Sequence, residues 1–496
     1  MKQTIYFADG PAGSGKTYSL HKFIEKLNGF ATIATQTNDL SEQQAKDLAN
    51  LGIKSKVISL QRTKNCTKSY ERHCEDMRGS VAIINQAVAL QTFGTHEFVG
   101  EKLPLNAMQH LFIDEYFSPV QRFELKDQIS GSHSSVAKLF KAKATEFPGV
   151  VELITSPEIA ELAMYGNSRD SSFKEHVIDL CRMVNSPHYR CFLSTENYLR
   201  FQAALIDENE TADEKDARQR LTVWAWMLPS ILEDYASVTL MGAHFAKSKI
   251  NLAWRDKVNF VPHPEIKGVR YSDFSHKTDL ITVRHISEDD VSMYRLEKIG
   301  YQNFVDEAAE VFEAAYPNGD YLVTLSAKDD YEWNGENGIQ ISPNPLGLNR
   351  FQHINMSIHL APLNPSDADV WIWEAVCGVT KEELMTAQAY EMQYQTATRT
   401  SIRDGKKNST KELVFAFLDR RSADHFRHSL GIKKPSELLR VPCLTDYQNQ
   451  PRRTRSDKKS DDEKHLAKMA RQRARRAEQA AVKAQQQAAT FTVAAE

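Results

Sequence analysis

The residues most able to do chemistry lie near the start of the chain, in the segment GPAGSGKT. This segment fits the pattern GxxxxGK followed by Ser or Thr, in which glycines let the backbone curl so that successive N–H groups face phosphates. A following helix would point its positive N-terminal end at the same place. Lys16 can reach the β- and γ-phosphates, and the Thr17 hydroxyl can bind Mg²⁺. We predict a site for ATP and Mg²⁺ formed by Gly10, Pro11, Ala12, Gly13, Ser14, Gly15, Lys16 and Thr17.

Two adjacent carboxylates, Asp114 and Glu115, follow the apolar run 111–113, about a hundred residues after the glycine-rich loop. An acid at the end of a buried strand can hold Mg²⁺, and a second acid can orient the attacking water as a general base. We therefore predict Thr17 and Asp114 as Mg²⁺ ligands and Glu115 as the catalytic base. The second acid favours hydrolysis over phosphate transfer to another substrate.

A third set of polar residues lies far along the chain, at Gln395, Arg399 and Arg403. On a helix, residues four apart share one face. Guanidinium groups on such a face can reach a γ-phosphate bound by another domain and stabilise charge in the transition state. A shared face of this kind would let Gln395 and the two arginines act together on a nucleotide bound by another domain.

The elements that must position these residues follow from the hydrophobic pattern. Short apolar runs, such as 4–8 before the loop, alternate with helical patterns, such as 17–26 after it. This alternation indicates α/β domains with parallel sheets. It predicts two domains, 1–260 and 261–440, and only the first has a phosphate loop. Between about 118 and 235 apolar residues fall at helical spacing, so we expect a mostly helical insertion in the first domain.

Composition and charge limit the class of protein. Hydrophobic and charged fractions of 41% and 26% are ordinary for a soluble globular chain, and a net charge of −3 excludes a basic nucleic-acid coat protein. Six cysteines without a CxxC pair favour free thiols. We find neither a signal peptide nor an apolar run long enough for a membrane span, so the expected location is the cytoplasm, or the host cytoplasm for a viral protein.

The predicted tail, 441–496, differs from the rest. Between Arg452 and Lys483 it has twelve Lys/Arg and five Asp/Glu. It is Ala/Gln/Arg-rich further on, so we expect a segment that is partly disordered or a single solvated helix. Its charge can neutralise nucleic-acid phosphates, and it could equally keep the protein soluble or bind a protein partner.

Several segments, in order, resemble the signature motifs of superfamily-2 helicases. Ala34–Gln43 (ATQTNDLSEQ) is similar to motif Ia, which in that family touches the nucleic-acid backbone. The resemblance therefore implies nucleic-acid contacts from Thr35, Thr37 and Asn38. Gln395–Arg403 is similar to motif VI, with the second arginine eight residues after the glutamine where the family has seven. The resemblance implies catalytic roles for Gln395, Arg399 and Arg403, and the shifted spacing leaves open which arginine reaches the phosphate.

Other segments depart further from the family pattern. Val238–His244 stands where motif III is expected, but Gly242 and His244 replace residues of the usual Ser-Ala-Thr. Tyr321–Ala327 resembles the strand of motif IV, and Gly347–Asn349 resembles part of motif V.

The resemblance implies an α/β fold with two RecA-like parallel-sheet domains and ATP in the cleft between them. It implies ATP-dependent movement along nucleic acid or its unwinding, with DNA favoured over RNA. The compact order of motifs would suit a phage or plasmid protein. One alternative is a phage DNA-packaging ATPase of the terminase type, which usually carries a C-terminal nuclease. Another is a non-motor ATPase switch or scaffold that binds a protein partner through the insertion or the tail.

Overall fold

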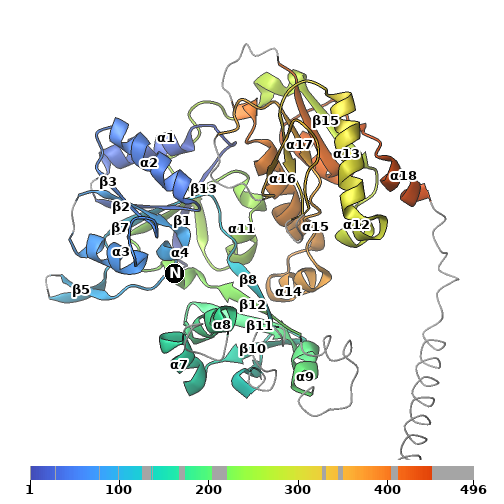
Figure 1. Ribbon diagram of the computed structural model, residues 1–496. Helices are drawn as coiled ribbons and strands as arrows, with labels where there is room; N and C mark the ends of the chain where they lie inside the picture. Colours follow the sequence, from blue (N-terminus) through green and yellow to red (C-terminus); the bar gives the residue numbers. More distant parts are fainter. Residues whose placement is uncertain are drawn as a thin grey trace, which may run out of the picture. The chain divides into compact units, whose positions relative to one another are not determined.

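The structure is a computed structural model that describes residues 2–27, 29–76, 79–98, 100–125, 136, 138–166, 174–203, 220–326, 331–343, 350–403 and 411–449. Residues up to 441 form one compact unit (Figure 1). Helix α18 (Pro442–Asn449) belongs to a second unit. Beyond this helix, the predicted basic tail lies outside the described residues.

A seven-stranded parallel sheet forms the first domain, with the strand order β14-β1-β13-β7-β2-β4-β3. The apolar runs predicted as strands in this domain are strands. The bounds are β1 (Thr4–Asp9), β2 (Phe30–Thr35), β3 (Ser55–Ile58), β4 (Val81–Asn85), β7 (Gln109–Asp114), β13 (Ser237–Gly242) and β14 (Asn259–Pro262). A short hairpin of β5 (Thr95–Phe98) and β6 (Glu101–Pro104) precedes β7.

Helices cover both faces of this sheet. Leu20 of α1 (Lys16–Lys26) and Leu48 of α2 (Asn38–Asn50) pack in one core cluster with Ile33 and Phe112, so these two helices cover the same face (Figure 1). The opposite face is covered by α3 (Cys66–Glu75), α4 (Gln86–Ala89) and α11 (Lys249–Trp254). Because the strands are parallel, the carboxyl ends of β1, β7, β13 and β2 meet at one edge of the sheet, where ligands bind in such folds.

The insertion is not mostly helical, so that prediction is wrong. Its central feature is a five-stranded antiparallel sheet with the order β8-β12-β11-β10-β9. The strands are β8 (Val120–Leu125), β9 (Lys141–Ala144), β10 (Val150–Ile154), β11 (Tyr189–Ser194) and β12 (Leu221–Met227), and the helices are α7 (Pro157–Tyr165), α8 (Glu175–Asn185) and α9 (Thr195–Ala203). Strand β12 packs Val223 into one core and Trp226 into another. It therefore lacks the apolar–polar alternation that marks a strand with one solvated face.

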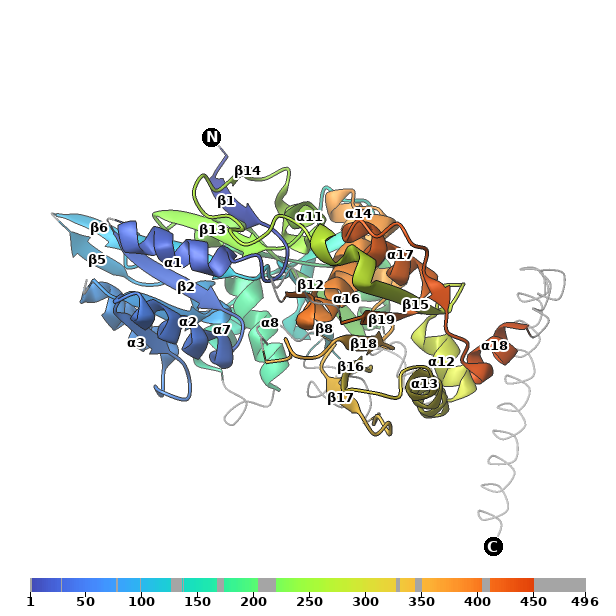
Figure 2. The ribbon, with the colours of Figure 1, turned by 90° about the horizontal axis from the view of Figure 1, so that it is seen from above.

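A six-stranded parallel sheet forms the second domain, with the order β17-β16-β18-β19-β15-β20. Helices α13 and α17 lie on opposite faces of this sheet (Figures 1 and 2). The strands are β15 (Ile281–Ser287), β16 (Tyr321–Thr324), β17 (Gly338–Ile341), β18 (Met356–His359), β19 (Leu413–Asp419) and β20 (Glu437–Leu438). The helices are α12 (Met293–Ile299), α13 (Tyr301–Ala315), α14 (Asp367–Cys377), α15 (Lys381–Met385), a π-helix (Thr386–Tyr390), α16 (Glu391–Ala397) and α17 (Arg420–Ser429).

Four short 3-10 helices complete the described elements, at Pro229–Leu232, Phe245–Lys247, Ser275–Leu280 and Ser401–Arg403. The two parallel sheets confirm the predicted fold class, an α/β chain with two RecA-like domains. Within the described residues, no helix is both long enough and apolar enough to cross a membrane.

The insertion also packs against the second domain. The rings of Trp226 on β12 and Trp373 on α14 lie 4.8 Å apart, centre to centre. Asp369 of α14 accepts hydrogen bonds from the indole of Trp224 at 2.8 Å and from Arg122 at 2.9 Å. Through its insertion, the first domain therefore contacts the second domain at a place away from the glycine-rich loop.

Candidate nucleotide site between two domains

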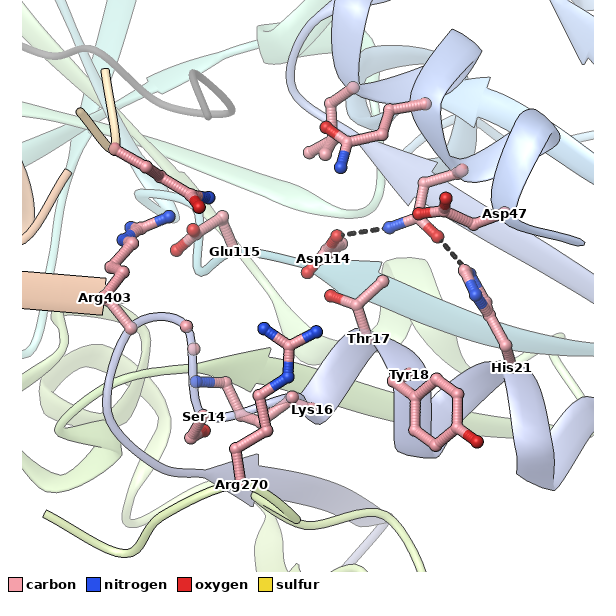
Figure 3. Close-up of a pocket in the computed structure, with 18 of the residues that line it drawn as sticks. Ser14, Lys16, Thr17, Tyr18, His21, Asp47, Asp114, Glu115, Arg270 and Arg403 are labelled. Carbon is pink, nitrogen blue, oxygen red and sulfur yellow. Dashed lines mark hydrogen bonds between the residues drawn. The ribbon is translucent and has the colours of Figure 1, made fainter. Parts of the chain in front are cut away.

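The glycine-rich loop runs from the end of β1 to the start of α1. Gly13 and Gly15 adopt φ angles of 78° and 92°, in the left-handed region that side chains disfavour, so the curled loop needs glycine there. Lys16 lies beside the curled loop (Figure 3). Its Nζ donates to the carbonyl oxygens of Gly10 and, at 2.9 Å, Pro11. Burial lowers the pKa of Lys16 to about 8, against the opposing pull of Glu115 and Asp114. The predicted loop thus has the geometry that its sequence requires.

Asp114 is the last residue of β7, and Glu115 follows it with a φ of 76°. A left-handed conformation at a non-glycine residue costs about 1–3 kcal/mol and is found at functional sites. The backbone holds it here, because Glu115 N–H donates to Met241 O at 3.0 Å and Gln86 Nε2 donates to Glu115 O at 2.9 Å. Burial and the neighbouring Glu115 raise the pKa of Asp114 to about 6. Both carboxylates line a cavity next to the glycine-rich loop.

The second domain contributes two arginines to the same cavity. Arg399 Nη2 donates to Glu115 Oε1 at 3.0 Å, and the Arg399 side chain is only 3% exposed. Burial alone would raise the pKa of Glu115, but Arg399 and Lys16 hold it below its ordinary value. Arg403 lines the cavity as well, and burial together with Arg399 lowers its pKa to about 9. The predicted Arg399 therefore contacts the predicted base, and the predicted Arg403 lines the same cavity.

The single helical face predicted for these residues is wrong. Helix α16 ends at Ala397, Arg399 lies in the following turn, and Arg403 ends a 3-10 helix. The hydroxyls of Thr398 and Thr400 donate back to carbonyl oxygens three residues earlier, which competes with a continuing helix.

Gln395, the third predicted member of this set, lies elsewhere. It lines a separate cavity of about 360 Å³, together with Gln36 and Tyr116. Its catalytic role stays a prediction, although Gln395 lines this second cavity and not the one that contains Lys16 and Glu115.

The cavity next to the glycine-rich loop has a volume of about 500 Å³ and includes residues that the sequence motifs did not indicate. Arg270, from the link between the two sheets, reaches into it from the side facing Lys16 (Figure 3). The backbone N–H groups of Val269 and Arg270 both donate to Ser14 O at 2.8 Å, and Tyr271 Oη donates to Ala12 O at 2.8 Å. The interdomain link is thus bonded directly to the glycine-rich loop.

The predicted nucleic-acid residues lie where β2 passes into α2. Thr35 is fully buried, and its hydroxyl pairs with Ser41 at 2.6 Å, so its side chain offers no contact surface. Thr37 caps α2 by accepting from Leu40 N–H at 3.3 Å, and Asn38 is the first helical residue; both are partly exposed. Contacts from Thr37 and Asn38 stay a prediction, whereas a side-chain contact from Thr35 is contradicted by its burial.

The segment that departs from the motif III pattern joins the domains. A side chain on Gly242 would overlap the ring of Tyr116, which explains the glycine. His244 has a φ of 53°, and its Nδ1 donates to Glu391 Oε2 at 2.7 Å across the domain boundary. His425 Nε2 pairs with the other oxygen of Glu391 at 3.0 Å. Burial opposes ionisation of Glu391, but these two partners lower its pKa to about 2.

The donor set suits a magnesium nucleotide. The cavity combines a curled N–H-rich loop, a lysine, a threonine hydroxyl and two carboxylates, which is the chemistry that phosphate oxygens and Mg²⁺ require. Thr17 and Asp114, the predicted Mg²⁺ ligands, line it together (Figure 3). In the part of the chain that the structure describes, no group of three His, Cys, Asp or Glu side chains is placed to hold a metal ion by itself. The predicted motif V segment, Gly347–Asn349, lies outside the described residues.

Comparisons with known proteins give structural similarities only. No protein-family model matches the chain, and no curated protein matches it. An apo structure of XPD is 12% identical, with 88% of this chain and 97% of that chain covered at a TM-score of 0.48. S. tokodaii Xpd4 is 11% identical, with 88% and 96% covered at 0.43. An S. cerevisiae Dbp5 variant bound to RNA and ADP BeF3 is 10% identical, with 90% and 88% covered at 0.34. At these identities the similarity concerns the fold alone.

Proposed function

We propose that this chain hydrolyses ATP, with Mg²⁺, between its two RecA-like domains and uses the cycle to move along or unwind nucleic acid. The observation that carries the proposal is the ion pair between Arg399 and Glu115. It joins residues 284 positions apart in sequence and brings an arginine of one domain onto the acid beside the other domain's glycine-rich loop. A site divided in this way works only when the domains are together, so hydrolysis and domain movement are coupled.

The chain's own groups would divide the chemistry as follows. Lys16 and the loop N–H groups bind the phosphates, and Glu115 accepts a proton from the attacking water. Its pKa is held below the ordinary value, so the carboxylate is ionised at neutral pH and able to act as the base. Arg399 and Arg403 face the charge that develops on the transferred phosphoryl group. Mg²⁺, when held by Thr17 and Asp114, would neutralise part of the phosphate charge.

Movement of the domains would reach nucleic acid through the carboxyl edge of the first sheet. Thr37 and Asn38 lie on this edge, and short polar side chains at a helix N-terminus suit phosphate contacts. The interdomain link bonded to the loop, and the bond from His244 to Glu391, are two further connections between the halves. The basic tail is a second candidate for phosphate contacts, and it and the insertion are candidates for binding a protein partner.

The test is ATP hydrolysis by the full chain with and without single-stranded DNA and RNA, with Lys16→Ala as the inactive control. We expect nucleic acid to stimulate hydrolysis, with a larger effect of DNA than of RNA. Hydrolysis that is the same with and without either polymer would reject the motor and favour an ATPase switch. A parallel assay for DNA cleavage with Mn²⁺ addresses the packaging alternative, because cleavage would indicate the nuclease that such proteins carry.

A further inference from the structure

A chain of three buried side chains runs from helix α1 to the predicted Mg²⁺ ligand. Gln44, on α2, is 1% exposed, and its Nε2 donates to Asp114 Oδ2 at 2.6 Å. Its Oε1 pairs with Nε2 of His21, which is 2% exposed and lies four residues after Thr17 on α1. Figure 3 shows the two hydrogen bonds that connect Asp114 to His21 through this side chain. The sequence motifs assign no role to either residue.

The direction of these bonds is determined by chemistry. A carboxylate only accepts, so Gln44 must turn its NH₂ group toward Asp114, and its oxygen then needs a donor on the other side. His21 provides that donor as a neutral imidazole protonated on Nε2. Burial lowers the pKa of His21, which favours the neutral ring. The histidine therefore opposes turning of the amide, because the flipped amide would place its oxygen against the carboxylate and its NH₂ group against the Nε2–H of His21.

This arrangement fixes the carboxylate that the proposed function needs. One oxygen of Asp114 is bonded to Gln44, so the carboxylate cannot rotate freely and its other oxygen is left for a ligand in the cavity. Partners of this kind orient metal-binding side chains, and their loss typically reduces metal affinity or activity about 10–100-fold.

We infer that Gln44, oriented by His21, is a positioning residue for Asp114 and determines how tightly the site holds Mg²⁺ with a nucleotide. The inference rests on the proposed ATP site. It goes beyond that site because it assigns a function to two residues outside the loop and outside the acid pair. A purely structural glutamine would contribute to folding stability but not to the Mg²⁺ dependence of nucleotide binding.

The test is binding of a fluorescent ATP analogue by the full chain, titrated with Mg²⁺ and repeated in EDTA. Gln44→Met keeps the length of the side chain and removes its donor. Gln109→Met is the matched control, because Gln109 is 2% exposed on the same strand as Asp114 but pairs with Thr32. Thermal unfolding of each variant reports its folding.

For Gln44→Met we expect a rise of about 10–100-fold in the Mg²⁺ concentration that gives half of the maximal increase in analogue binding, while the affinity for the analogue in EDTA changes less than about twofold. His21→Phe should give a smaller shift in the same direction, and Gln109→Met none. An unchanged Mg²⁺ midpoint in Gln44→Met, or an equal loss with and without Mg²⁺, would overturn the inference. If the wild-type chain itself binds the analogue no better with Mg²⁺, the proposed ATP site fails and the inference fails with it.

Discussion

Replacing Arg399 with alanine should reduce ATP hydrolysis about 10³-fold with little change in nucleotide affinity. The guanidinium is 3% exposed and lies 3.0 Å from Glu115 Oε1. Two unit charges about 4 Å apart interact by about 4 kcal/mol at an effective dielectric constant of about 20. A similar interaction with the charge on the transferred phosphoryl group, at about 1.4 kcal/mol for each factor of ten, gives that reduction. It lies at the lower end of the effect of an arginine that completes such sites, about 10³–10⁵.

The assay measures initial rates of phosphate release at saturating ATP and Mg²⁺ and, separately, the affinity for a fluorescent ATP analogue. Arg420→Ala is the control, because Arg420 belongs to the same domain but is 54% exposed and pairs with Glu288 on the surface. Such surface pairs contribute about 0–1 kcal/mol, and this one is outside the cavity, so its rate should match the wild type. Hydrolysis by Arg399→Ala within about threefold of the wild-type rate would refute the assignment of Arg399 to the site.

Three further predictions follow from single contacts. Lys16→Ala should weaken binding of the ATP analogue about 10–100-fold, since a charge-assisted hydrogen bond contributes about 1.5–3 kcal/mol; unchanged binding would remove Lys16 from the site. Glu391 has a pKa of about 2 in the folded chain against an ordinary 4.5, so its contribution, about 3 kcal/mol, is present above pH 4.5 and lost as the pH falls toward 2. The difference in the free energy of unfolding between wild type and Glu391→Gln, measured with urea, should therefore disappear over this range. A constant difference would contradict the bond to His244. Gly242→Ala should lower the free energy of unfolding by about 1–3 kcal/mol through overlap with Tyr116, measured in the same way.

The parts of the site that could be predicted from the sequence are those that local rules determine. The loop conformation depends on glycines at Gly13 and Gly15, and the acid pair depends on an apolar strand that ends at Asp114. Both features are contained within a few consecutive residues. Arg399 could be predicted because its segment resembles motif VI of superfamily-2 helicases, although the helix expected to carry it ends at Ala397.

Other features depend on contacts that no local pattern contains. The insertion contains a sheet because β12 packs both of its faces, and that burial hides the period of a strand. Gln44 becomes part of the site only when α2 lies beside β7. One signal was present: Gln44 stands between Leu40 and Leu48 at helical spacing, so a polar side chain occupies the apolar face of a helix. A buried polar side chain must find a partner, and here the partner is Asp114.

The central claim, that ATP hydrolysis between the domains drives movement along nucleic acid, is tested most directly by phosphate release on single-stranded DNA of increasing length. The full chain is bound to DNA and mixed with ATP and a trap that prevents rebinding. A chain that moves hydrolyses more ATP on a longer strand before it dissociates, so we expect phosphate per binding event to rise with length and to be lost in Arg399→Ala. Phosphate release that is independent of DNA length would contradict the account, even if DNA stimulates hydrolysis.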